Sequence, residues 1–133
     1  MMHSRKSHWK VRGRGNVAIE YGLILPVLII FTVGIMDTGR LLWSAATLNR
    51  AAEAAARCAA INTTDCGTTA QIQTRAVAEA WGLTIAASAF TITKPACGIQ
   101  VAATYDFTFL TPGVGAFVPL GIQTLSATAC YPL

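Results

Sequence analysis

The stretch VAIEYGLILPVLIIFTVGIM, residues 17–36, decides the fold of this 133-residue chain. A helix over these residues is about 30 Å long at 1.5 Å per residue, which matches the hydrocarbon core of a bilayer. Its ionisable side chains, Glu20 and Tyr21, lie in the first turn and a half, and the next one along the chain is Asp37. Residues 17–36 therefore predict a transmembrane helix, with Asp37 marking its far surface.

The charge of the chain is unevenly distributed. Residues 1–14 hold five of the ten basic residues and no acid, and only 12% of the chain is charged, against about 25% in a soluble domain. A short basic tail beside an apolar helix follows the positive-inside rule, so we expect the tail in the cytoplasm and the residues after Asp37 outside the membrane. Nucleic-acid binding is not expected, because the positive charge is confined to the tail instead of covering a domain surface.

A cleaved secretory signal is the first alternative to a membrane anchor. Such a signal has an apolar region of about 7–15 residues followed by a small-residue cleavage site. Here the apolar run is longer, and residues 36–50, MDTGRLLWSAATLNR, continue the helical pattern. The segment is therefore expected to remain as an anchor. Pro26 lies inside it and is expected to bend the helix, which membrane helices tolerate. The sequence does not decide whether this kink has a function.

The helix is expected to continue outside the membrane to about Ile61. No proline occurs over residues 37–61, and apolar residues recur there at alternating spacings of four and three. This 3.5-residue period suits packing along a partner helix or a sheet, and its small residues permit close backbone approach. The seam consists of Leu41, Ala45, Leu48, Ala52, Ala55 and Ala59.

The remaining residues predict a small domain of a second helix and three strands. Thr68 followed by Gln71 is a capping-box signal that opens a helix to about Trp81, and Gly82 is positioned to end it. Apolar and polar residues then alternate strictly over the longest predicted strand, as in a half-buried strand. The predicted strands are 89–93, 97–110 and 122–131, with a loop at 111–121. The expected fold class is α+β, with a long helix, a short helix and a small antiparallel sheet.

Four cysteines lie on the predicted outer side of the membrane. An even number in an oxidising envelope indicates disulfides, and three connectivities exist. We favour Cys58 with Cys66, which flank a short loop, and Cys97 with Cys130, which bracket two strands joined by one loop. A zinc site is disfavoured because no CxxC pair occurs.

Residues that could support catalysis are scarce. The two histidines, His3 and His8, lie in the basic tail, and the acids of the outer part are scattered singly. No serine or cysteine has a histidine to activate it, and no glycine-rich phosphate loop occurs. We expect neither an enzyme activity nor a metal or other cofactor.

Glu20 is the residue that an apolar anchor by itself does not explain. A charged side chain costs about 2.5–3.5 kcal/mol at the bilayer centre and less near the surface. Taken alone, Glu20 would reach the cytoplasmic surface or pair with Arg12 or Arg14. Its surroundings, however, form a pattern: a basic tail, Gly15, four residues, the pair Glu20-Tyr21 and then the apolar helix.

This pattern resembles the processing site of type IV prepilins, especially the Flp and TadE-like class of the tight-adherence system. The resemblance implies that a membrane-embedded aspartic peptidase, the prepilin peptidase, cuts between Gly15 and Asn16 and removes the leader. The new amino group on Asn16 has a reference pKa of about 7.7–8.0, so it is mostly cationic at neutral pH. Glu20 lies four residues further on the same helix face and can neutralise it, within its own chain or a neighbouring subunit.

The resemblance to TadE-like proteins extends over residues 12–60 and, more loosely, over the ending 125–133. It comprises the arginine-glycine start, the Glu-aromatic pair, an apolar run with a proline, an acid-x-Gly-Arg step and an alanine-rich helix that ends near Ala56-Arg57. The residues that it implies for processing are Gly15, Asn16, Glu20 and Tyr21. The residues that it implies for the helix and its assembly are Glu20, Pro26, Asp37, Gly39 and Arg40.

A minor pilin or pseudopilin that takes part in assembly of a Flp-type (type IVb) pilus is the implied function. Its parts would be a leader (1–15), an N-terminal helix (16–61, within the membrane over about 17–36) and a disulfide-stabilised periplasmic or extracellular domain (62–133). The implied partners are the prepilin peptidase, other pilins, the pilus assembly machinery and lipid of the bacterial inner membrane. The alternative is an uncleaved signal-anchored envelope protein whose outer domain binds a ligand or scaffolds another complex.

Overall fold

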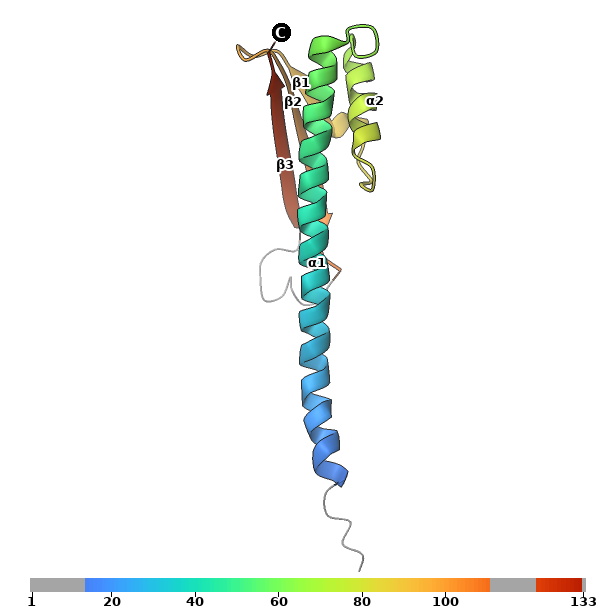
Figure 1. Cartoon of the computed structure of the whole chain (residues 1–133), viewed down its shortest axis with the longest axis vertical. Coiled ribbons are helices and arrows are strands. Elements are labelled where there is room, and N and C mark those ends of the chain that lie inside the picture. The colour runs from blue at the N-terminus through green and yellow to red at the C-terminus, as the bar shows by residue number, and fades with distance from the viewer. Residues whose placement is uncertain (1–13, 111–121, 133) are drawn as a thin grey trace, which may run out of the picture.

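One helix runs the length of the molecule. The computed structural model describes residues 14–110 and 122–132, so the predicted loop 111–121 and most of the leader lie outside the described residues. Helix α1 spans Arg14–Ile61, 48 residues, and continues through Pro26. The other elements lie beside its C-terminal half, while its N-terminal half stands clear of them (Figure 1).

The free half of α1 is apolar on all sides. Its most apolar 18-residue window has a mean hydropathy of 2.2, and none of that window is buried inside the structure. Among the described residues, α1 is the one helix long and apolar enough to cross a membrane. A helix that is hydrophobic all round and lacks protein neighbours needs lipid or other chains around it. Its large side chains that are more than half exposed include Ile19, Leu23, Leu25, Val27, Leu28, Ile30 and Phe31.

Helix α2, Thr69–Glu79, begins at the predicted capping box. The Gln71 N–H donates to Thr68 Oγ1 at 3.3 Å, and the Thr68 N–H donates to Gln71 Oε1 at 3.1 Å. The helix ends earlier than the predicted Trp81, with Ala80 as its C-cap. Gly82 follows with a φ of +84°, a left-handed conformation that stops further helix.

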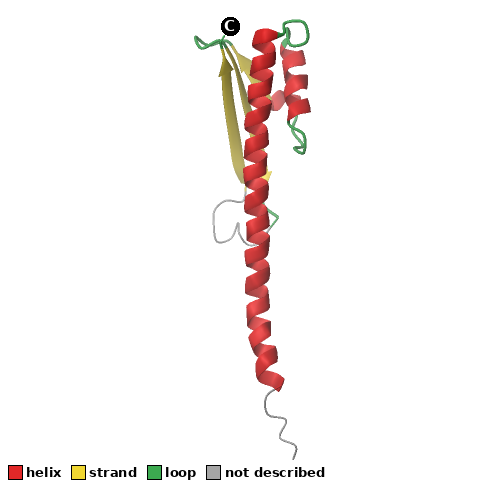
Figure 2. Ribbon diagram, viewed as in Figure 1, coloured by secondary structure: helices red, strands yellow, loops and turns green. Residues whose placement is uncertain are grey.

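A three-stranded antiparallel sheet completes the fold (Figure 2). Its order is β1–β2–β3, with β1 at Phe90–Thr93, β2 at Ile99–Thr108 and β3 at Ile122–Tyr131; a 3-10 turn, Ala87–Ala89, precedes β1. In the β2–β3 ladder, Ile99 pairs with Tyr131 and Thr108 with Ile122.

The central strand is two residues shorter at each end than predicted. At its start, the Gly98 N–H donates to the Pro95 carbonyl at 3.0 Å, so residues 97 and 98 close a turn and leave the ladder. At its end, the Leu110 N–H donates to a side chain of α1. The alternation itself holds, because Ile99, Val101 and Phe107 are buried. The predicted α+β class, with a long helix, a short helix and a small antiparallel sheet, is confirmed.

The core lies on both flanks of α1. The outer half of the helix is flanked by α2 on one side and by the strands on the other (Figure 1). The predicted seam is buried at Leu48, Ala52, Ala55 and Ala59. Ala51 and Ala56 are also buried, because two partners cover a wider arc of the helix than one seam can fill. Alanine at these positions lets α2 and the sheet approach the helix backbone closely.

Candidate processing and assembly site

The predicted processing residues lie in the first two turns of α1. Gly15 and Asn16 form part of its first turn, and Glu20 lies one turn further on. Residues four apart on a helix are neighbours on one face. Asn16 and Glu20 therefore lie on the same face of α1.

Glu20 is a carboxylate without a partner among the described residues. Its side chain is exposed and makes no hydrogen bond or ion pair with the residues that the structure describes. Arg12 and the side chain of Arg14, the alternative partners, lie outside the described part. Beside it, Tyr21 is 69% exposed, and the next acid along α1 is Asp37. An exposed carboxylate on an otherwise apolar helix is a strong acceptor for a cation that comes from elsewhere.

Asp37 occupies a different environment from the one expected of a residue at the membrane surface. It is only 3% exposed. Arg40 Nη1 donates to its Oδ1 at 3.0 Å, and the Leu110 N–H donates to Oδ1 at 3.3 Å and to Oδ2 at 3.2 Å. The carboxylate thus ties the middle of α1 to the end of β2, 73 residues further along the chain.

Within the sequence Asp37-x-Gly39-Arg40, the acid is buried, whereas Gly39 and part of the Arg40 side chain face away from the rest of the described structure. The guanidinium of Arg40 lies over the Phe107 ring, 5.2 Å from its centroid, while nearly half of the Arg40 side chain is exposed. A Cβ at Gly39 would meet no atom within 4 Å. The spacing of three residues between the acid and the arginine could have pointed to this local pair. Nothing in the sequence pointed to Leu110.

Pro26 lies within the apolar part of α1, and its side chain is exposed. Its flanking residues Leu25 and Val27 are 59% and 67% exposed. Among the described residues, none of the most apolar window of α1 is buried, so this region can contact lipid or another helix.

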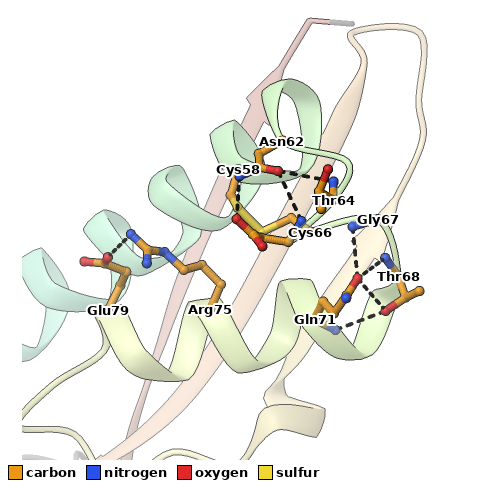
Figure 3. The surroundings of a disulfide bond; sticks show 10 residues. Cys58, Asn62, Thr64, Cys66, Gly67, Thr68, Gln71, Arg75 and Glu79 are labelled. Carbon is orange, nitrogen blue, oxygen red and sulfur yellow. Dashed lines mark hydrogen bonds and ion pairs between the residues drawn. A yellow bond between two sulfur atoms is a disulfide. The ribbon is translucent and has the colours of Figure 1, made fainter.

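The four cysteines form two disulfides, Cys58–Cys66 and Cys97–Cys130. The first joins the end of α1 to the loop before α2 (Figure 3). Asn62 shapes that loop, because its Oδ1 accepts the N–H groups of Thr64 and Asp65 at 3.2 and 3.1 Å. Both disulfides lie in the outer domain, where they cross-link the helix end and the sheet end.

The described residues contain no grouping suited to metal binding. They include no cluster of three or more His, Cys, Asp or Glu side chains that could hold a metal ion. The predicted tail histidines, His3 and His8, lie outside the described residues. A groove between α1 and α2 is lined by Arg57, Asp65 and Arg75 among others. Arg75 also pairs with Glu79 at 2.7 Å.

The N-terminal part of the chain is similar to a known protein family. Residues 15–57 match the model of the TadE family, described as TadE-like protein, which is about a third of the chain. No curated protein and no solved structure gives a significant match. The suspected resemblance to TadE-like proteins is thereby confirmed. A TadE-like segment implies a structural role in the tight-adherence pilus system, and the single long apolar helix suggests a single-pass membrane anchor.

Proposed function

We propose, from its TadE-like residues 15–57, that this chain is a minor pilin or pseudopilin of a tight-adherence pilus. The chain enters the inner membrane with its basic tail in the cytoplasm. The prepilin peptidase removes the leader by cutting between Gly15 and Asn16. The mature subunit then joins the pilus, or the complex that initiates it, through the apolar half of α1.

The isolation of Glu20 is the observation that carries this proposal. Its carboxylate is exposed on an apolar helix and lacks a partner among the described residues. Cleavage after Gly15 would place a cationic amine on Asn16, one turn away or on a neighbouring subunit. Pairing the two charges lowers the cost of burying either in an apolar bundle. Glu20 then serves as a docking group.

The division of α1 into two halves supports the same role. The outer half is buried between α2 and the sheet, whereas none of the most apolar window is buried. A helix with a free apolar half can pack laterally against identical or related helices while its domain stays outside the bundle. The open Gly39 and the exposed part of Arg40 lie where the two halves meet.

Intact-mass analysis after co-expression with a prepilin peptidase tests the processing step. We expect a chain that begins at Asn16, and we expect a Gly15→Leu variant to keep its leader because a bulky side chain obstructs the peptidase at the cut. Retention of residues 1–15 beside an active peptidase would favour the uncleaved signal-anchored alternative.

Assembly is tested separately with Glu20→Gln. We expect this variant to be membrane-inserted but to lose association with other pilins and pilus production, because the amide cannot neutralise the amine. Glu53→Gln is the matched control, since Glu53 is an exposed acid on the outer half of the same helix. Equal pilus production by both variants would contradict a docking role for Glu20.

A further inference from the structure

Two tryptophans from separate elements form an exposed pair beside α1. Trp43 lies on α1 and Trp81 directly follows the end of α2; their ring centroids are 5.5 Å apart at an interplanar angle of 78°. Trp43 is 53% exposed and Trp81 is 56% exposed. Two large side chains held together at the surface form an apolar patch that water covers poorly.

The height of the pair along α1 places it at a membrane surface. The apolar span ends at Met36, and Trp43 lies seven residues further on. This separation corresponds to about 10 Å along the helix axis. Side chains on a helix lean back over the preceding turn, so the Trp43 ring lies lower than its Cα. The polar layer on each side of a bilayer core is about 5–8 Å thick. Trp81 is held at the same level by the ring contact.

A groove connects Trp43 to the membrane-spanning segment. It is lined by Met36, Arg40, Trp43, Leu83 and Phe107 among others. It therefore runs from the last residue of the span to Trp43, and Arg40 is its charged lining residue. Leu42 and Leu110, at the same end of the domain, are 65% and 69% exposed. Because Asp37 is buried, the lipid-facing surface of α1 is not interrupted at that acid.

The charges around the pair offer little resistance to contact with lipid. Residues 81–93 carry no charged side chain. The nearest charges on α1 and α2 form the ion pairs Asp37–Arg40 and Arg75–Glu79. Asp106 lies on the exposed side of β2, where it accepts a hydrogen bond from Thr124 at 2.8 Å. Paired charges leave little net charge to desolvate when this end approaches a bilayer.

We infer that Trp43 and Trp81 seat the outer domain on the bilayer, with both indole rings in the headgroup layer. Tryptophan favours this layer because its ring is apolar and its N–H finds polar partners there. Two contacts, one on the anchor helix and one in the turn after α2, fix the rotation of the domain about α1. The partner is a phospholipid surface, and the inference requires α1 to span the bilayer but neither leader cleavage nor pilus assembly.

Depth-dependent quenching of tryptophan fluorescence in the full chain tests whether both indole rings lie in the headgroup layer. The chain is reconstituted singly in nanodiscs of phosphatidylcholine and phosphatidylglycerol, with Trp9→Phe to remove the leader tryptophan. Trp43→Phe or Trp81→Phe then leaves one reporter at a time. The lipids carry bromine either near the headgroup end or near the methyl end of the acyl chain, and iodide probes exposure to water.

Each remaining tryptophan is expected to lose most of its emission to the shallow bromine, less to the deep bromine and little to iodide. The Trp9→Phe chain keeps both Trp43 and Trp81 and should show the same order of quenching. It is the control for the single-tryptophan variants, in which the contact between the two rings is lost. The water-exposed control is Ile61→Trp in a chain without other tryptophans, because Ile61 is 62% exposed at the distal end of α1.

Two results would overturn the inference. In the first, Trp81 is quenched by iodide as strongly as the Ile61→Trp reporter and is insensitive to bromine, so it faces water. In the second, Trp81 is protected from iodide but insensitive to bromine at either depth, so a protein surface covers it. Either result would leave the pilin proposal intact, since cleavage and assembly are measured independently of lipid contact.

Discussion

The carboxylate of Asp37 accepts the backbone N–H of Leu110 across 73 residues of sequence, at 3.2 Å from Oδ2 and 3.3 Å from Oδ1. This bond connects the point where α1 leaves the apolar span to the point where β2 ends. The outer domain is thereby attached to its anchor at the membrane side as well as along the alanine seam.

Replacing Asp37 with alanine should destabilise the outer domain. Hydrogen bonds to charged groups contribute about 1.5–3 kcal/mol to stability, and the variant loses those from Leu110 and Arg40. Chemical denaturation in detergent, followed by near-ultraviolet circular dichroism, measures the change. Asp106→Ala is the control, since its bond to Thr124 is exposed and surface changes stay within about 0.5 kcal/mol. Equal effects of the two variants would show that the Asp37 bridge adds no stability.

The two disulfides should differ in their effect on stability. Cys97–Cys130 closes a separation of 33 residues and Cys58–Cys66 one of 8. A longer loop restrains the unfolded chain more, which gives about 4 kcal/mol for the first and about 2.5 kcal/mol for the second. Denaturation midpoints of the two double Cys→Ser variants check the order. A larger loss on removing Cys58–Cys66 would mean that native packing around that loop outweighs chain entropy.

Gly98→Ala should destabilise the sheet. Gly98 has a φ of +124°, and a Cβ there would overlap the carbonyl oxygen of Tyr131. Alanine at a positive φ costs more than about 1 kcal/mol even without such an overlap. Gly39→Ala is the matched control, because its Cβ meets nothing within 4 Å and alanine favours the helix by about 1 kcal/mol. Thermal unfolding should therefore move in opposite directions for the two variants.

Thr68→Ala should weaken α2 at its start. The variant loses the hydroxyl that accepts the Gln71 N–H, and loss of such a cap costs about 1 kcal/mol. Thr74→Ala provides the comparison, because the Thr74 hydroxyl only bonds the Ala70 carbonyl within the helix and alanine is the better helix former. Amide hydrogen exchange over residues 69–79 should rise in the first variant and not in the second. Unchanged exchange in Thr68→Ala would rule out the cap as a determinant of α2.

Local signals predicted the elements well. Hydropathy over residues 17–36 indicated the anchor, the pair Thr68 and Gln71 indicated where α2 begins, and strand β3 has the predicted bounds of 122–131. Each of these signals is complete within a few consecutive residues. The ends that differed, at Trp81 and at both ends of β2, are those where a turn or a distant partner takes the backbone hydrogen bonds.

In the candidate site too, relationships within one element could be predicted from the sequence, whereas contacts between distant residues could not. The relationship between Asn16 and Glu20 follows from helix geometry alone, because four residues make about one turn. The environment of Asp37 and the contact between Trp43 and Trp81 could not be read from the chain, since their partners lie 73 and 38 residues away.

By itself, then, the sequence determined that one helix is apolar enough for lipid and that a capped helix and alternating strands follow it. The tertiary structure decided that α1 is buried on two sides, that Asp37 is a bridge and that two tryptophans meet beside the span. Periodicity shows which face of an element is apolar, but it does not show which surface will cover that face. The covering surface depends on how the whole chain packs.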